Sequence, residues 1–251
     1  MTYRELAKQI DDNLYPEVSA AGSLANALGK ALAEIGSPLE ASAPVNFLQI
    51  ARVEGGSRFC QMYIAAHERL FTFDFWTMGV GYGNGACSDL NEAARALHFW
   101  ITEKPDIAAM QSRFQLFVPR EQALAHEAGK AVEYQWTELE RSWATPENAN
   151  AALSPLPLIQ AASQQADLRQ LFPFTSLYSL HFSRTTGYPF TNDCPFATPI
   201  GDGRFRAHSA SQAVIGEGSI EEVIEMLIAN LPSNCGPAVD GTAEDFASES
   251  K

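Results

Sequence analysis

The sequence contains the same order of local patterns twice. Short runs with the period of a β-strand lead into a glycine-spaced turn and then an amphipathic helix, in residues 45–103 and again in residues 177–231. Each helix opens with a capping pair, Asp89 with Glu92 and Ser219 with Glu222. Because the strands cluster instead of alternating one by one with helices, antiparallel pairing is favoured over a doubly wound parallel sheet. The predicted fold class is α+β, with two β-rich units each followed by a capped helix.

Alternation and turn residues indicate the strands of the first unit. Residues 45–53 and 58–65 flank a Gly-Gly turn, which predicts a β-hairpin. Phenylalanine then occupies every second position from 71 to 75, a period of two that a helix cannot use. We therefore expect these three rings to face a core.

The turn before the first capped helix reads GVGYGNG, with glycine at positions 79, 81, 83 and 85. This spacing is neither G-x-G-x-x-G nor a P-loop, and Asp89 and Glu92 would place negative charge where a phosphate would bind. The pattern instead predicts a strand or bulge with one bare face, which a neighbouring segment can approach closely.

The second unit shows the same signals. Tyr178, Leu180 and Phe182 alternate with polar residues, and Gly201-Asp202-Gly203 is typical of a hairpin turn. After Leu231 the sequence is turn-rich, and we expect it to fade into disorder.

Helical patterns fill the remaining segments. A helix with apolar spacing is predicted from residue 24 to Gly36, and residues 104–172 are predicted to be helical, with one long stretch from residue 119 to 143. The predicted organisation is residues 1–103 with the first unit, residues 104–172 as a helical insertion, and residues 173–251 with the second unit and an acidic tail. The pattern leaves open whether these parts form one domain and whether the two units share a sheet.

Charge and cysteine usage limit the classes of function. Thirty acidic against seventeen basic residues give a net charge of −13, which repels nucleic acid and anionic membranes and favours either solubility or a basic partner. No basic segment precedes an apolar run at the start, and no run of eighteen apolar residues occurs, so we expect a cytoplasmic protein. The four cysteines are far apart and are expected to be reduced.

One polar cluster contains the residue types of a thiol nucleophile. His181, Asp193 and Cys194 supply an imidazole, a carboxylate and a thiol, but the sequence does not fix their separation. A polar strand face beside a structural turn is the alternative interpretation and the favoured one. No cofactor motif is present, and no metal site is expected, because no ligand pair has the short spacing of structural zinc sites.

Two further groups are candidates for binding a protein partner. Glu221, Glu222 and Glu225 fall on the polar side of the last amphipathic helix. Trp136 and Trp143 are seven residues apart and share a helix face, where core packing is the more common role and an exposed aromatic anchor is the alternative.

Three segments carry a resemblance: YPEVSAAGSL, LHFSRTTGYPFTNDCPF and IANLPSNCGPAVDGTAEDF. They resemble an uncharacterised bacterial family, a domain of unknown function whose members sometimes carry the label natural product biosynthesis protein. The family brings no established catalytic residues. A small acidic α+β protein without catalytic motifs is also similar in type to immunity proteins that neutralise toxins of competing bacteria.

The resulting hypothesis is a non-catalytic acidic binding protein that masks a basic surface on a partner such as a toxin. The alternative is an enzyme or accessory protein that acts on a small metabolite, with His181, Asp193 and Cys194 at its centre. The sequence specifies no oligomeric state.

Overall fold

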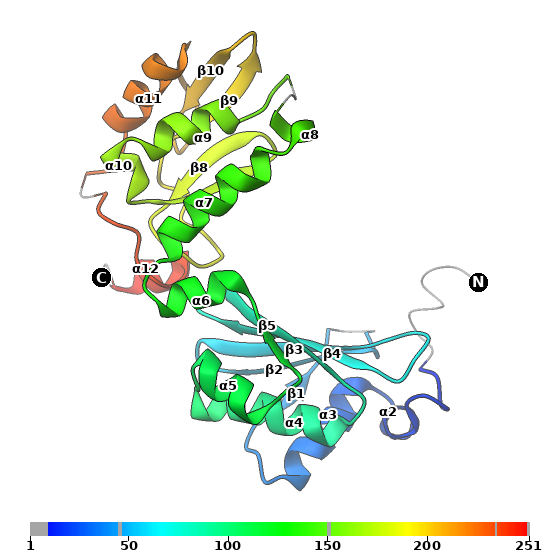
Figure 1. The fold of residues 1–251 in the computed structure, drawn as a ribbon. Helices are drawn as coiled ribbons and strands as arrows, with labels where there is room; N and C mark the ends of the chain where they lie inside the picture. The colour runs from blue at the N-terminus through cyan, green and yellow to red at the C-terminus, as the bar shows by residue number, and fades with distance from the viewer. Residues whose placement is uncertain (1–9, 45–46, 150–151, 234, 250–251) are drawn as a thin grey trace. The chain divides into compact units, whose positions relative to one another are not determined.

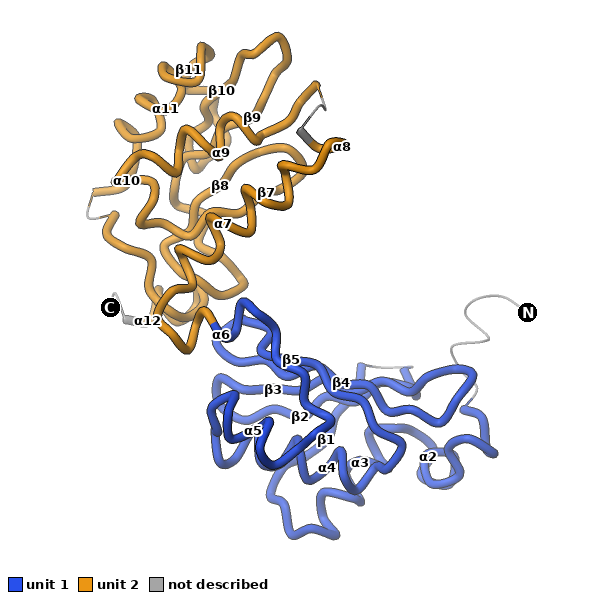
Figure 2. Tube along the Cα trace, viewed as in Figure 1, with its two compact units in different colours: residues 1–124 blue, residues 125–251 orange. Residues whose placement is uncertain are grey.

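A computed structural model describes residues 10–44, 47–149, 152–233 and 235–249. The chain divides into two compact units, unit 1 with residues 1–124 and unit 2 with residues 125–251 (Figure 2). The boundary lies inside the segment 104–172, which was predicted to be one helical insertion. The helices of that segment are therefore divided between the two units.

Unit 1 combines helices with an antiparallel sheet (Figure 1). Among its described residues the sheet contains six strands in the order β1-β2-β3-β4-β5-β6, so each strand pairs with the next along the chain. Its elements are α2 (Pro16–Ala21), α3 (Leu24–Glu34), β1 (Ala41–Ser42), β2 (Ile50–Gly55), β3 (Arg58–Ile64), β4 (Phe71–Thr77), β5 (Val80–Cys87), α4 (Leu90–His98), the π-helix η1 (Phe99–Glu103), α5 (Ile107–Arg113), β6 (Phe117–Pro119) and α6 (Glu121–Glu127), which crosses the unit boundary.

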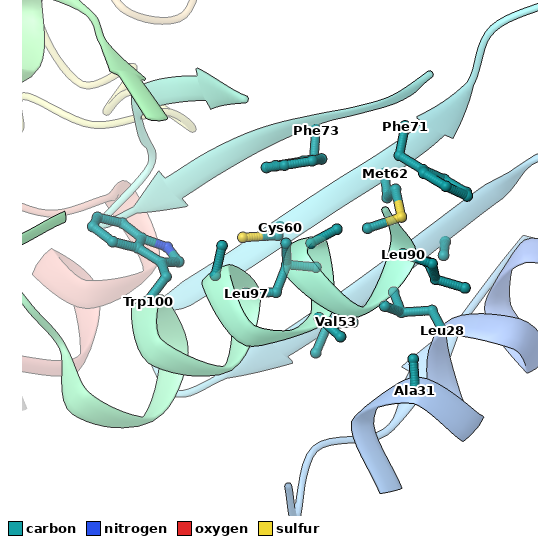
Figure 3. Close-up of a cluster of buried hydrophobic side chains, with 14 of the residues drawn as sticks. Leu28, Ala31, Val53, Cys60, Met62, Phe71, Phe73, Leu90, Leu97 and Trp100 are labelled. Carbon is teal, nitrogen blue, oxygen red and sulfur yellow. The ribbon is translucent and has the colours of Figure 1, made fainter. Parts of the chain in front are cut away.

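The alternating residues of unit 1 place one face of the sheet in a core. Phe71, Phe73 and Phe75 are all buried, which confirms the prediction from their period of two. Figure 3 shows how side chains from β2, β3 and β4 meet those of α3 and α4. The Gly-Gly turn joins β2 to β3 as predicted, with Gly56 at a φ of 63° that favours glycine.

Three of the four alternating glycines, Gly81, Gly83 and Gly85, lie in strand β5, and they allow close packing. A Cβ atom at Gly83 would overlap the ring of Phe117, and one at Gly85 would overlap the ring of Phe73. This confirms the predicted bare strand face, and one of the approaching segments is β6, a strand of three residues that the sequence analysis missed.

Unit 2 has a separate sheet, so the two β-rich units do not share one. In the described part of the chain it contains five antiparallel strands in the order β11-β10-β9-β8-β7. Its elements are α7 (Ala131–Trp143), α8 (Pro146–Ala149), α9 (Leu156–Ser163), α10 (Ala166–Arg169), β7 (Phe172–Ser176), β8 (Ser179–Ser183), β9 (Phe196–Gly201), β10 (Arg204–His208), β11 (Val214–Gly218), α11 (Ile220–Ala229) and α12 (Ala243–Glu249).

Local sequence signals explain most elements of unit 2. Asp202 and Gly203 both have positive φ in the tight turn from β9 to β10, as the predicted hairpin requires. Helix α11 begins with a complete capping box between Ser219 and Glu222. In unit 1 the corresponding cap takes a simpler form, in which the side chain of Asp89 accepts a hydrogen bond from the amide of Asn91.

Three sequence predictions need correction. The long helical stretch from residue 119 to 143 is broken at Gly129, whose φ of 67° ends α6 before α7 begins. Strand β7 was missed, because Pro173 and a preceding helical pattern hide it in the sequence. The prediction of disorder was wrong for the end of the described chain, where residues 243–249 form α12.

Helices α7 and α11 pack against the unit 2 sheet, and α9 packs against both helices. Each unit has a hydrophobic core of its own. The architecture is therefore α+β, with two antiparallel β units each followed by a capped helix, as predicted. No helix in the described residues has the length and apolar character needed to cross a lipid bilayer.

Candidate functional site

A row of stacked rings lies on the face of the unit 2 sheet that points away from its core, and His181 is at its centre. Alternation along β8 buries Leu180 and Phe182 and places His181 on the opposite face. There its imidazole stacks on Phe174 of β7 and on Phe196 of β9, with ring centroids 5.1 and 4.4 Å apart.

The row continues beyond His181 in both directions. Phe190 stacks on Phe174, and His208 of β10 stacks on Phe196, each with ring centroids 4.7 Å apart. Burial among these rings, together with the nearby His208, lowers the pKa of His181 from its usual 6.5 to about 4. His181 is therefore neutral at neutral pH and a weak proton acceptor.

Cys194 lies in the core of unit 2 and not on this ring row. Its sulfur is 3.9 Å from the sulfur of Cys235 and 4.0 Å from Oδ1 of Asp193. Burial raises the pKa of the Cys194 thiol far above its usual range, so the thiolate is disfavoured. Asp193 forms an ion pair with Arg184, with 3.0 Å between Nη1 and Oδ2.

The three residues of the alternative, catalytic interpretation are thus not brought together as a triad. Asp193 contacts Cys194, but no imidazole forms a hydrogen bond with Cys194 among the described residues, and His181 is held between Phe174 and Phe196. A thiol nucleophile needs an adjacent base or a lowered pKa, and this arrangement supplies neither. The same part of the chain contains no group of three or more His, Cys, Asp or Glu side chains placed to hold a metal ion.

The three glutamates of α11 are exposed. Glu222 serves the helix itself, because its carboxylate accepts a hydrogen bond from the amide of Ser219 at 2.8 Å. Hydrogen bonds from the backbone and from Ser219 lower the pKa of Glu221. Within the described residues, none of Glu221, Glu222 and Glu225 forms an ion pair, so all three charges face solvent.

The two tryptophans of α7 differ in accessibility. Trp136 is only 6% exposed, belongs to the core of unit 2, and donates a hydrogen bond from Nε1 to the carbonyl oxygen of Arg169 at 3.0 Å. It therefore cannot act as the exposed anchor considered from the sequence. Trp143 is half-buried and contacts the ring of Tyr178, which is 44% exposed beside the 88% exposed Leu177 in the turn from β7 to β8.

Unit 2 also contains a cavity of about 630 Å³ that the sequence analysis did not identify. Its wall combines the first turns of α7, the end of α9, Arg169 and the segment that follows α11. In that segment Asp240 accepts a hydrogen bond from the hydroxyl of Thr186 at 3.0 Å and lies 3.5 Å from Nδ1 of His126. Burial lowers the pKa of His126 despite this carboxylate. No local motif could have revealed the cavity, because its wall comes from distant segments.

Positively charged, negatively charged and hydroxyl side chains line this cavity. They include Lys130, Glu133, Thr137, Arg169, Thr186 and Asp240.

Comparison with known proteins relates unit 2 to a family. Residues 130–242 match the model of a family of unknown function (DUF6193). The match covers fewer than half of the 251 residues. It contains His181, Cys194, the glutamates of α11 and nearly the whole wall of the cavity, and it does not extend to YPEVSAAGSL in unit 1. No curated protein matches the chain, and no solved structure does.

Proposed function

We propose that this protein is a non-catalytic binding protein that recognises a basic protein partner through the exposed face of α11. The observation that carries the proposal is the set of three solvent-facing carboxylates, Glu221, Glu222 and Glu225, on a unit with a strong excess of acid. Residues 125–251 contain sixteen acidic and seven basic residues, a net charge of −9. Such a surface attracts a basic partner and speeds association with it.

The geometry around Cys194 supports binding over catalysis. Its thiol contacts Asp193 and Cys235, and its raised pKa disfavours the nucleophilic form. The likeness in type to immunity proteins suggests a specific version of the proposal, in which the partner is a toxin and the complex forms in the cytoplasm. Among the accessible aromatic side chains of unit 2, the contacting pair Trp143 and Tyr178 would supply affinity.

The experiment compares two charge reversals of equal size. The full chain is used to recover a stoichiometric partner from the native cells, and association is then measured for E221K/E225K and for E34K/E40K. Glu34 and Glu40 are exposed residues of unit 1, and Glu222 is left intact because it caps α11. We expect at least tenfold weaker binding for the α11 variant, mainly through a slower association rate at low salt, and unchanged binding for the control.

Equal effects of the two double variants, or recovery of no stoichiometric partner, would contradict this proposal. A loss that persists unchanged in high salt would also count against it, because attraction between exposed charges is screened.

The cavity of unit 2 favours a second candidate, a role in binding a small metabolite. Its volume of about 630 Å³ falls within the range of small-molecule sites, and Lys130, Arg169, Glu133 and Asp240 offer charges of both signs. A small metabolite bound in this cavity would suit an accessory role in natural product biosynthesis. We expect a polar metabolite with one positive and one negative group to raise the melting temperature of the protein. R169A should abolish this rise, and R204A should leave it unchanged.

A screen of amino acids, amino sugars and short peptides by thermal shift tests the second candidate. Arg204 is the matched control because it is an exposed arginine of the same unit and lies outside the cavity wall. A shift that is retained in R169A would place the ligand elsewhere.

A further inference from the structure

Two of the four cysteines meet in unit 2 although they are 41 positions apart. Cys194 precedes β9, Cys235 follows α11, and their sulfur atoms are 3.9 Å apart. Cys194 is buried in the core, whereas Cys235 is only partly buried. The distance is too long for a disulfide, whose sulfur atoms lie about 2.05 Å apart, but the closure required is of the size that side-chain rotation supplies.

Cys235 begins a segment that lies across the rest of unit 2. The side-chain amide of Gln170 donates to the carbonyl oxygen of Cys235 at 3.1 Å, and the amide of Ala238 donates to the carbonyl oxygen of Gln170 at 2.9 Å. Val239 then pairs with the strand-like stretch after β8. The amide of Val239 donates to the carbonyl oxygen of Arg184 at 3.0 Å, and its carbonyl oxygen accepts from the amide of Thr186 at 3.0 Å.

This segment, residues 235–241, is called the strap below. It also forms part of the cavity wall, through Ala238 and Asp240. The contacts that hold it are mainly single hydrogen bonds, each of which stabilises only modestly. A covalent link at Cys235 would therefore change how firmly the strap is held.

We propose that Cys194 and Cys235 form a reversible disulfide under oxidising conditions, which fixes the strap to the segment that leads into β9. The modification site is the sulfur pair, and the co-reactant is a small-molecule disulfide such as glutathione disulfide. The inference is independent of the binding functions proposed above, because it depends only on the two thiols and on the contacts of the strap.

The exchange proceeds in two balanced steps. Cys235 is the more accessible thiol, so its thiolate attacks one sulfur of the small disulfide, forms a mixed disulfide and releases one small thiolate. Cys194 then loses its proton to solvent and attacks the sulfur of Cys235, and the second small thiolate leaves. The two protein thiols are oxidised by two electrons, and the small disulfide is reduced to two thiols.

The local environment favours Cys235 as the first nucleophile. Burial and the charge of Asp193 raise the pKa of its thiol, but the hydrogen bond with Cys194 and the charge of Arg184 lower it. For Cys194, burial, the neighbouring Cys235 and Asp193 raise the pKa, and only Arg184 lowers it. The order of attack follows from this difference and from the greater exposure of Cys235.

The other two cysteines provide an internal control. Cys60 is wholly buried in the core of unit 1, and the Cys87 sulfur contacts the carbonyl oxygen of Asp89 at 3.2 Å. Among the described residues, neither sulfur has another sulfur as a hydrogen-bond neighbour. The C60S/C87S variant should therefore oxidise as the unmodified chain does.

The test oxidises the dilute full chain with glutathione disulfide and maps its cysteines by mass spectrometry without reduction. We expect an intramolecular link between Cys194 and Cys235, a loss of two hydrogens, and full reversal by excess dithiothreitol. The link should persist in C60S/C87S and disappear in C194A and in C235S. Stable glutathione adducts, a link to Cys60 or Cys87, or no reaction over hours would each overturn the proposal.

A second measurement tests the effect on the strap and needs no cysteine variant, so it stays valid if C194A does not fold. Hydrogen exchange is compared between the oxidised and reduced full chain. We expect the amides of Ala238, Val239 and Thr186 to exchange at least tenfold more slowly after oxidation, with unchanged rates in β3 and β4 of unit 1. Equal rates for the strap in the two states would contradict the proposed fixing of the segment.

Discussion

His181 and Phe196 stack with ring centroids 4.4 Å apart and planes 17° apart. Burial in this stack lowers the pKa of His181 to about 4 in the folded protein, below the value of 6.5 in an unfolded chain. Between these two values the unfolded state binds more protons than the folded state. The stability contributed by the neutral imidazole is therefore present above pH 6.5 and is lost as the pH falls toward 4.

Replacing His181 with Phe should reduce this loss. The H181F variant keeps a planar ring between Phe174 and Phe196 but cannot bind a proton, so its free energy of unfolding should fall less between pH 6.5 and 4. Urea unfolding at several pH values measures the difference, with H67N as a control at an exposed histidine. A pH profile that is the same in H181F and the unmodified protein would refute the assignment.

Adding one methyl group at Gly85 should destabilise unit 1. The Cβ of G85A would overlap the buried ring of Phe73, so the strand or the ring would have to shift. Overpacking of this kind costs about 1–3 kcal/mol. The control is G29A in helix α3, where nothing lies within 4 Å and the change should stabilise by about 0.5–1 kcal/mol. Chemical denaturation measures the free energy of unfolding of both variants. Equal values for G85A and G29A would contradict the predicted overlap with Phe73.

The two tryptophans of α7 should separate folding from recognition. W136A removes a core side chain and its hydrogen bond to Arg169, so we expect a loss of about 3–5 kcal/mol in unfolding free energy. W143A removes a half-buried ring and should cost about 1 kcal/mol. If the proposed partner also contacts Trp143, W143A should weaken that binding more than it weakens the fold. Thermal unfolding and partner affinity, measured on both variants, decide this.

Sequence periodicity predicted the elements whose burial is one-sided. The phenylalanines of β4 were placed correctly because one face of the sheet is buried in the core. The capping box of α11 was recognisable because its two residues lie three positions apart in the sequence. Strand β6 escaped because three residues carry too little pattern, and its place beside β5 depends on the bare face left by Gly83.

The candidate site was less accessible to sequence reasoning. The row around His181 depends on which residues face each other across four strands, and a one-residue change in register would move every side chain to the other face. The pairing of Cys194 with Cys235 and the wall of the cavity join segments that no local motif connects. The sequence identified His181, Asp193 and Cys194 as residue types of interest, and only the three-dimensional arrangement separates the imidazole from the thiol.

Tyr15 shows a structural role that the sequence analysis did not find, and it gives a sharp test of unit 1. Its hydroxyl lies 2.9, 2.7 and 3.1 Å from the carbonyl oxygens of Ala65, Glu68 and Leu70 and accepts a hydrogen bond from the amide of Leu70 at 3.0 Å. A hydroxyl has one hydrogen, so it donates to one carbonyl at a time while it accepts from that amide. This hydroxyl thus joins the connection between β3 and β4, which the backbone hydrogen bond from the amide of Ala65 to the carbonyl oxygen of Leu70 also closes.

Y15F should therefore lower the free energy of unfolding by about 1–3 kcal/mol, because the partly buried amide of Leu70 loses its acceptor while the ring still packs against Phe71. The matched control is Y178F, since Tyr178 is exposed in unit 2 and its change should stay within about 0.5 kcal/mol. Urea unfolding gives the energies, and hydrogen exchange at Leu70 should accelerate in Y15F only. An unchanged exchange rate at Leu70 would mean that the backbone pairing between Ala65 and Leu70 holds this connection without the hydroxyl.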